Sequence, residues 1–181
     1  MSCDRPRDGQ RVPVVDLLAQ FGNADHRPAS ARFEMTEHTF GGRSRASLVV
    51  PAESRIVWTL LVPRRARLVL WAGVPDVNGA ASAAFRVGAS DGRVYVTVTE
   101  QTVSSDETMR QGWVPVTADL SPFAGRKLSI FYRPDRIRWQ VIIGTHILSG
   151  SPGIVYLGEP VIDTDRDGVR EYMKRRTTRA Q

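Results

Sequence analysis

The sequence predicts an all-β protein, an antiparallel β-sandwich of about ten strands with one short helix near the N-terminus. Two observations carry this prediction. From residue 32 onward, short runs of alternating or wholly apolar residues follow one another, which is the pattern of strands with one or both faces buried. The turn-forming clusters between these runs are short, whereas parallel strands need crossovers of a dozen or more residues. Neighbouring strands are therefore expected to pair antiparallel.

The first apolar segment, residues 14–21, favours the short helix. Its apolar residues follow the i, i+3, i+4, i+7 spacing of a helix face, and Gly22 with Asn23 supplies a stop signal. These apolar residues are Val14, Leu17, Leu18 and Phe21. An edge strand is the alternative for so short a run. Residues 1–12 are polar and rich in Arg, Asp, Pro and Gly, so they predict a flexible N-terminus.

Ten further segments carry strand signals, and clusters of Gly, Pro, Asp and Ser separate them. The predicted strands are residues 32–40, 46–50, 55–62, 67–74, 83–89, 93–100, 113–119, 127–133, 138–143 and 154–162. The clearest hairpin lies between Ser90 and Gly92, because glycine can adopt the positive φ that such a turn requires. Alternation along the fourth of these strands places Leu68, Leu70 and Ala72 on its core-facing side.

The segment 113–133 contains two strand signals joined by a corner. Apolar and polar residues alternate along its first part, Pro122 and Gly125 interrupt the pattern, and the alternation then restarts. Asp119 and Ser121 are expected to hold the turn through hydrogen bonds from the backbone to their side chains. The motif therefore identifies a fold rather than a chemistry.

Charge is distributed unevenly along the chain. The net charge is +6, and residues 164–181 hold six basic and three acidic residues, which is half of the excess. These residues predict a basic C-terminal tail or linker that follows a sandwich of residues 13–163. Nucleic-acid binding is not indicated, because the tail has, apart from Tyr172, none of the stacking aromatic side chains that usually accompany basic residues in such sites.

Cysteine content and hydropathy bear on whether the protein is disulfide-bonded, binds zinc or spans a membrane. Cys3 is the only cysteine, so neither an intrachain disulfide nor a cysteine-based zinc site is expected. No window approaches the roughly 20 apolar residues of a membrane span, and the first residues lack the apolar region of a signal peptide. Cysteine followed by a polar tether is also how a mature bacterial lipoprotein begins, so lipidation of Cys3 is an alternative to an ordinary terminus.

Four motifs extend the prediction from fold class to family. They are ARLVLWAGV, FRVGASDGRVYVTV, DLSPFAGRKLSIFYR and YLGEPVI. Together they resemble the galactose-binding-like jelly-roll modules, a fold of many carbohydrate-binding modules. The resemblance is greatest to the module N-terminal to bacterial sulfatase domains, where an opening like VDLLAQFGNADHRP is also typical. It covers about residues 14–163, although Leu157 stands where these modules usually carry Trp.

This resemblance implies a non-catalytic accessory module of a bacterial cell-envelope or sulfatase-type system, located in the periplasm or on the cell surface. No sulfatase nucleophile motif, Cys/Ser-x-Pro-x-Arg, occurs in the chain. The expected partner is a carbohydrate or a neighbouring catalytic domain. A purely structural domain that packs on a hydrolase and binds no sugar is the first alternative. The sequence does not indicate an oligomeric state.

Candidate sugar-binding residues lie in loops at one end of the predicted sandwich. An aromatic ring can cover the apolar face of a pyranose while Arg, Asp and Asn bind its hydroxyl groups. The resulting candidates are Trp139 with Arg138, Arg136 and Asp135, and the loop residues Asp76 and Asn78. Further aromatic and basic candidates are Trp71, Trp113, Tyr95, Tyr132 and Arg133. A tryptophan is also a common core residue, which is the alternative for each of the three.

The segment 163–168, DTDRDG, is the sharpest local motif. Oxygen donors at alternate positions before a glycine can wrap a calcium ion, the one cofactor that the sequence suggests. The candidate ligands are Asp163, Asp165, Asp167 and Glu171. The EF-hand pattern fails because its twelfth position is Lys174. A polar exit from the last strand into a linker is the alternative.

The three histidines give no catalytic signature. His26, His38 and His146 lie in separate elements, without metal-ligand spacing and without a flanking nucleophile motif. We therefore expect no enzymatic activity. A small β-sandwich enzyme acting on polysaccharides is the second alternative, and His146 is the residue through which it can be tested.

Overall fold

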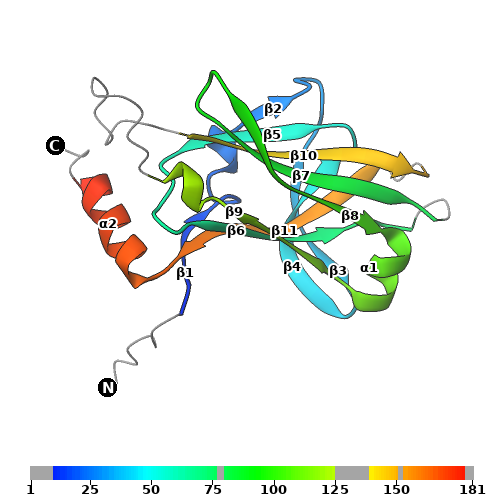
Figure 1. Cartoon of the computed structure of the whole chain (residues 1–181). Coiled ribbons are helices and arrows are strands. Elements are labelled where there is room, and N and C mark those ends of the chain that lie inside the picture. Colours follow the sequence, from blue (N-terminus) through cyan, green and yellow to red (C-terminus); the bar gives the residue numbers. More distant parts are fainter. Residues whose placement is uncertain (1–9, 77–79, 125–138, 151–152, 178–181) are drawn as a thin grey trace.

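Two antiparallel sheets pack face to face in the computed structural model, which describes residues 10–76, 80–124, 139–150 and 153–177 (Figure 1). Within these residues, one sheet has six strands and the other has five. The predicted class, an all-β antiparallel sandwich, is therefore confirmed.

The six-stranded sheet is built around the last strand of the chain. Its strands are β1 (Val12–Asp16), β3 (Glu34–Phe40), β4 (Arg43–Pro51), β6 (Arg67–Gly73), β9 (Val114–Asp119) and β11 (Ile154–Thr164). The order is β3-β4-β11-β6-β9, and β1 also pairs with β11. One edge of β11 pairs first with β4 and then with β1. Between these two pairings lies Glu159, whose φ of 43° marks an irregularity in the strand.

The five-stranded sheet covers the opposite side of the core. Its strands are β2 (Asp25–Arg27), β5 (Arg55–Leu60), β7 (Ser82–Ser90), β8 (Tyr95–Ser104) and β10 (Trp139–Ser149). The order is β2-β5-β10-β7-β8, so β10 is central and the short strand β2 is at one edge. The predicted hairpin joins β7 to β8, and Gly92 has a φ of 92° there, which confirms that prediction.

The core lies between the two inner faces. Leu68, Leu70 and Ala72 of β6 are fully buried, as their alternation predicted. In the opposite sheet, Trp58 of β5 is buried and its indole Nε1 donates to the Leu17 carbonyl oxygen at 3.2 Å. This bond satisfies the one polar atom of a large core side chain, as burial requires.

The α-helices of the described residues lie at the ends of the sandwich. The α-helices are α1 (Ser105–Gln111) and α2 (Arg166–Thr177), and the short 3₁₀ turns are η1 (Phe21–Asn23) and η2 (Ser121–Phe123). Figure 1 shows α1 and α2 at opposite ends. Helix α1 begins where the Ser104 hydroxyl accepts a hydrogen bond from the Glu107 N–H at 3.0 Å. No helix of the described residues is long and apolar enough to cross a membrane.

The helix predicted at residues 14–21 is wrong, and the alternative edge strand is right. Strand β1 pairs with β11, with Val15 opposite Ile162, and the backbone hydrogen bonds of this ladder outweigh a weak helical spacing. The Asp16 carboxylate then accepts the N–H groups of Leu18 and Ala19 at 2.9 and 3.1 Å, which ends the strand in a turn.

The basic tail predicted for residues 164–181 is also wrong where the structure describes it. Strand β11 continues to Thr164, and residues 166–177 form α2, whose Tyr172 is buried against the core. The N-terminal prediction is wrong for Arg11, which is held by an ion pair to Asp163. Residues 1–9 and 178–181 lie outside the described residues.

The corner after β9 forms as predicted. The Asp119 Oδ1 atom accepts hydrogen bonds from both the backbone N–H, at 2.9 Å, and the hydroxyl group of Ser121. These bonds close the turn into η2 and keep the Asp119 pKa below its usual value. The strand predicted at 127–133 lies outside the described residues.

The docking of α2 gives a test of this fold. Gly168 is buried, and a Cβ atom there would lie 2.7 Å from the Arg64 carbonyl oxygen and closer still to the Thr164 hydroxyl. We expect Gly168→Ala to lower the free energy of unfolding by about 1–2 kcal/mol, because overpacking outweighs the gain in helix propensity. Urea denaturation measures the change.

The matched control is Gly22→Ala, where nothing lies within 4 Å of the added Cβ. It should change the free energy of unfolding by less than about 0.5 kcal/mol. Equal effects at the two positions would show that α2 is not packed against the Arg64 backbone.

Candidate functional site

A groove of about 670 Å³ lies on the outer face of the five-stranded sheet. Its lining residues come from β2, β5, β7, β8 and β10 and from the turns beside them. They are Arg27, Pro28, Glu53, Ser54, Arg55, Ala84, Arg86, Tyr95, Ile142, Gly144, Thr145 and His146. The groove thus spans the sheet from its β2 edge to its β8 edge.

The floor of the groove is formed at two points by small residues, Gly144 of β10 and Ala84 of β7. Gly144 of β10 lies opposite Arg55 of β5 on one side and opposite Arg86 of β7 on the other. Ala84 lies opposite His146 in the same ladder. Since paired residues of antiparallel strands point to the same face, long side chains stand on both sides of a glycine.

Tyr95 provides an aromatic wall at the β8 edge. It is 49% exposed, and its ring packs over Gly88 of β7. A Cβ atom at Gly88 would lie 2.4 Å from the Tyr95 ring and hydroxyl, so only glycine leaves room for this placement. The ring therefore lies against the β7 backbone at Gly88 and remains half exposed to a ligand.

Glu53 and His146 form a polar pair at one end of the groove. The Glu53 Oε2 atom lies 2.7 Å from Nδ1 of His146, and its Oε1 accepts the Ile147 N–H at 2.8 Å. The backbone bond and, after it, the bond to His146 hold the pKa of Glu53 below its usual value. The Glu53 carboxylate is therefore ionised at neutral pH.

Arginines supply the positive charge of the groove. Arg86 donates through Nε to Glu100 Oε2 at 2.6 Å, and this bond raises the pKa of its guanidinium. Arg27 lies directly opposite Arg55 in the pairing of β2 with β5. Together these groups can bind hydroxyl or anionic oxygens, while Tyr95 can cover an apolar ring face.

Trp139, predicted as the sugar platform, is instead a core residue. Its side chain is 7% exposed and meets Phe123 edge to face, with ring centroids 5.0 Å apart. The ring faces the core because Trp139 is in phase with Val141 and Ile143 of β10, both buried. Its predicted companions Arg138, Arg136 and Asp135 lie outside the described residues, as does Asn78. Asp76 is exposed and does not line the groove.

The wider set of aromatic candidates divides between the two sheets. Trp71 lies on the outer face of the six-stranded sheet, with the Arg45 guanidinium 3.9 Å from its ring centroid. Trp113 is buried, and its Nε1 donates to the Arg43 carbonyl oxygen at 2.8 Å. Only Tyr95 of this set lines the groove, and Tyr132 and Arg133 lie outside the described residues.

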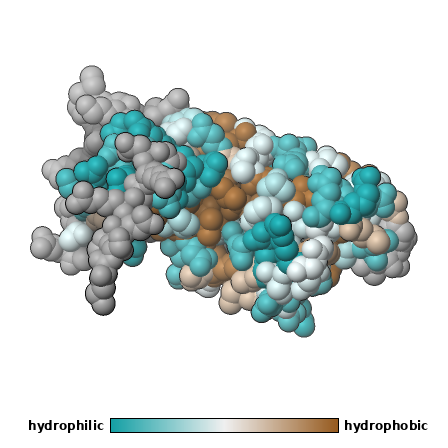
Figure 2. Space-filling view, turned by 90° about the horizontal axis from the view of Figure 1, so that it is seen from below, coloured by the Kyte–Doolittle hydropathy of each residue, from teal (hydrophilic) through white to brown (hydrophobic). Residues whose placement is uncertain are grey.

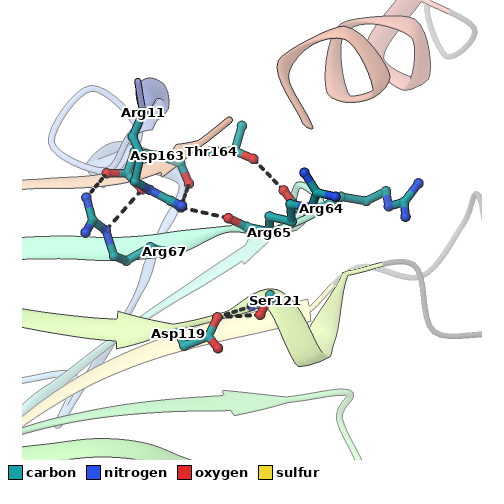
Figure 3. Close-up of polar contacts among 8 residues, drawn as sticks. All are labelled: Arg11, Arg64, Arg65, Arg67, Asp119, Ser121, Asp163 and Thr164. Carbon is teal, nitrogen blue, oxygen red and sulfur yellow. Dashed lines mark hydrogen bonds and ion pairs between the residues drawn. The ribbon is translucent and has the colours of Figure 1, made fainter. Parts of the chain in front are cut away.

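The predicted calcium ligands do not converge. Asp163 receives Arg11 at 2.6 Å and Arg67 at 2.7 Å, and Figure 3 shows the three side chains pointing toward one another. The other carboxylates also face arginines: Asp165 contacts Arg65, Asp167 contacts Arg170, and Glu171 contacts Arg64 and Arg175. In the described part of the chain, no three His, Cys, Asp or Glu side chains are placed to share a metal ion.

A change of backbone structure separates these carboxylates. Asp163 lies on β11, whereas Asp165 precedes α2 and accepts the Gly168 N–H at 2.8 Å. This bond and the Arg65 guanidinium hold the Asp165 pKa below its usual value. The motif therefore forms the junction between strand and helix.

Sequence reasoning missed Arg27, Arg55 and Arg86 as candidate site residues. They are far apart in the chain, and only the pairing of β2, β5, β10 and β7 brings them together. The available signal was the position of Arg55 and Arg86 next to apolar runs, but such residues are usually solvated side chains, and Arg27 between His26 and Pro28 gave no such signal.

Solved carbohydrate-binding modules have a similar fold. The tandem CBM22-1–CBM22-2 domain of Xyn10C from Paenibacillus barcinonensis matches 89% of this chain, with a TM-score of 0.52 and 11% identity. The CBM51-2 and INT domains of ZmpB from Clostridium perfringens match 77% of it, with a TM-score of 0.51 and 9% identity. The chain has the fold of a carbohydrate-binding module.

At such low identity the likeness extends to the fold alone. The matches cover 51% of the Xyn10C structure and 29% of the ZmpB structure, so this chain spans about half of the first and less of the second. No family model matches the chain, and no curated protein matches it.

The ion pairs of Asp163 give a second test. We expect Asp163→Ala to lower the free energy of unfolding by about 1–3 kcal/mol, because it removes the nearly buried carboxylate that Arg11 and Arg67 share. Asp167→Ala, which removes an exposed pair with Arg170, should change it by less than about 0.5 kcal/mol. Thermal unfolding with and without millimolar calcium measures both. A calcium-dependent rise in the melting temperature that Asp163→Ala abolishes would restore the metal hypothesis.

Proposed function

We propose that this chain is a non-catalytic carbohydrate-binding module and that its ligand lies in the groove of the five-stranded sheet. The observation that carries the proposal is the half-exposed ring of Tyr95, which contacts Gly88 and lines the groove together with Arg55, Arg86 and His146. A planar apolar surface next to hydrogen-bonding groups is what a pyranose ring requires. Because most of these groups stand on paired strands, little conformational entropy is lost when they bind a sugar.

The fold likeness supports the same class of function. One solved form of the CBM51-2 module of ZmpB, which matches this chain with a TM-score of 0.51, is a complex with GlcNAc. A groove across a sheet face also suits a chain of sugar units better than a single enclosed molecule. We infer that the ligand is a polysaccharide or an extended oligosaccharide.

A second candidate function is packing against a neighbouring catalytic domain, and the six-stranded sheet favours it. Its outer face carries half-buried apolar side chains that belong to β4, β6 and β11. They are Val49, Val69, Trp71, Tyr156 and Val161. Figure 2 shows a hydrophobic area in the middle of the molecule as seen from this side. Such a surface is typical of contact with another protein surface.

We infer an extracytoplasmic setting, in a bacterial cell-envelope or sulfatase-type system. The support for this setting is the resemblance of the ARLVLWAGV, DLSPFAGRKLSIFYR and YLGEPVI motifs to sulfatase-associated modules. The fold likeness is consistent with such a role, since a module of this fold joined to an enzyme can hold the enzyme on its substrate.

Tyr95 is the residue to change in a test of glycan binding. We expect Tyr95→Ala to weaken the retention of the protein in gels containing a bound polysaccharide by about five- to tenfold, because the ring face is lost. Affinity electrophoresis against a panel of plant, bacterial and animal polysaccharides measures this. Met35→Ala, which removes an exposed apolar side chain from the other sheet, is the control and should leave retention unchanged. Equal retention of the two variants would place the ligand elsewhere.

His146 tests whether the module is an enzyme. Its pairing with Glu53 resembles an acid–base pair, so incubation with the same polysaccharides should be followed for new reducing ends and for unsaturated products. We expect none above the background measured with His146→Ala. Product release that this substitution abolishes would favour the polysaccharide-active enzyme instead.

A further inference from the structure

One row of paired residues crosses the five-stranded sheet and carries three arginines. Arg27 of β2 lies opposite Arg55 of β5, Arg55 lies opposite Gly144 of β10, and Gly144 lies opposite Arg86 of β7. Glu100 of β8, opposite Arg86, completes the row. Because residues paired across antiparallel strands point to the same face, all of these side chains stand on the groove side of the sheet.

Of the three arginines in this row, only Arg86 has a carboxylate partner within the described part of the chain. Arg86 has Glu100 at 2.6 Å, but no described carboxylate lies within ion-pair distance of Arg27 or Arg55. The acids nearest to them along the chain are Asp25 and Glu53. Asp25 forms no ion pair with a described side chain, and Glu53 already uses one oxygen for His146 and the other for the Ile147 N–H. Two like charges directly opposite each other destabilise a strand pair, so this edge of the groove lacks an anion.

We propose that Arg27 and Arg55 bind the anionic group of an acidic saccharide, either the carboxylate of a uronic acid or a sulfate ester, whose sugar ring lies across Gly144 toward Tyr95. This inference rests on the proposed function and names its ligand class. Both anions offer the paired oxygens that a guanidinium binds in bidentate fashion. A neutral glycan would leave the two arginines facing each other without compensation.

The dimensions of the row fit this arrangement. The backbones of β5 and β7 lie two strand spacings apart, about 10 Å, with only the Gly144 Cα between them. A sugar ring can therefore rest on the floor between Arg55 and Arg86. Arg86 is paired with Glu100, so Arg27 and Arg55 are the groove arginines without a carboxylate partner among the described residues.

The net positive charge of the protein means that a control must separate non-specific attraction of polyanions from binding in the groove. A net charge of +6 attracts any polyanion at low ionic strength, wherever its arginines are. Arg43 is an exposed arginine of β4, in the other sheet, and has no ion pair among the described residues. Arg43→Gln removes the same charge as Arg27→Gln or Arg55→Gln but leaves the groove intact, so it measures the non-specific attraction.

The experiment compares four polymers by isothermal titration calorimetry at 0.15 M salt, using wild type and the three single variants. Polygalacturonate carries carboxylates, dextran sulfate carries sulfate esters, and xylan and dextran are the neutral references. We expect wild type to bind at least one of the two acidic polymers about tenfold or more tightly than the neutral ones. Arg27→Gln and Arg55→Gln should each weaken that binding about tenfold, whereas Arg43→Gln should weaken it less than about twofold.

Each outcome decides between the two proposals. Loss confined to the two groove variants supports the inference, and the polymer that binds identifies its anion. Equal weakening by all three variants overturns it, because attraction would then depend on net charge alone. Binding of a neutral polymer as tightly as the acidic ones overturns it while the proposed function stands. Binding of no polymer overturns both. Melting temperatures of Arg27→Gln and Arg55→Gln at or above that of wild type confirm that these variants are folded.

Discussion

The pairing of β10 with both of its neighbours is the constraint on which core and groove depend. Alternate residues of this strand, Val141 and Ile143, fill the core, while Ile142, Gly144 and His146 line the groove. A slip of one residue would place the groove residues in the core and the core residues in water. The burial of the apolar set therefore fixes the register, and this register sets Gly144 between two arginines. The core side of the strand thus positions the groove.

Much of the fold follows from local patterns, and the parts that were wrong depended on distant partners. The hairpin at Gly92 and the corner at Asp119 use bonds between residues two or three apart, so a short segment contains the whole signal. Strand β1 is decided by β11, about 150 residues away. Helix α2 buries Tyr172 and Gly168 but has few apolar residues, which is why its sequence resembled a solvated tail.

The candidate site was less predictable for the same physical reason. A tryptophan in a loop and one at the first position of a central strand look alike in sequence, yet Trp139 is in phase with the buried residues of β10. The groove depends on two glycines as much as on its larger side chains: Gly88 leaves room for the Tyr95 ring, and Gly144 forms part of the floor. A glycine within a strand indicates that another group packs closely against the backbone there. Which side chain this is depends on the pairing of strands across the sheet, and a local sequence pattern does not contain that information.

The two outer faces of the sandwich differ in chemistry, and this bears on the choice between binding and packing. The groove side presents arginines, a glutamate and a histidine, which suit an oxygen-rich ligand and would be costly to bury against an apolar protein surface. The face of β4, β6 and β11 presents half-buried aliphatic and aromatic groups beside charged ones such as Arg45, and its apolar part suits a protein partner. Because the core separates these faces, occupation of one leaves the other accessible. Glycan binding and packing on a catalytic domain are therefore compatible roles of one module, each assigned to its own sheet.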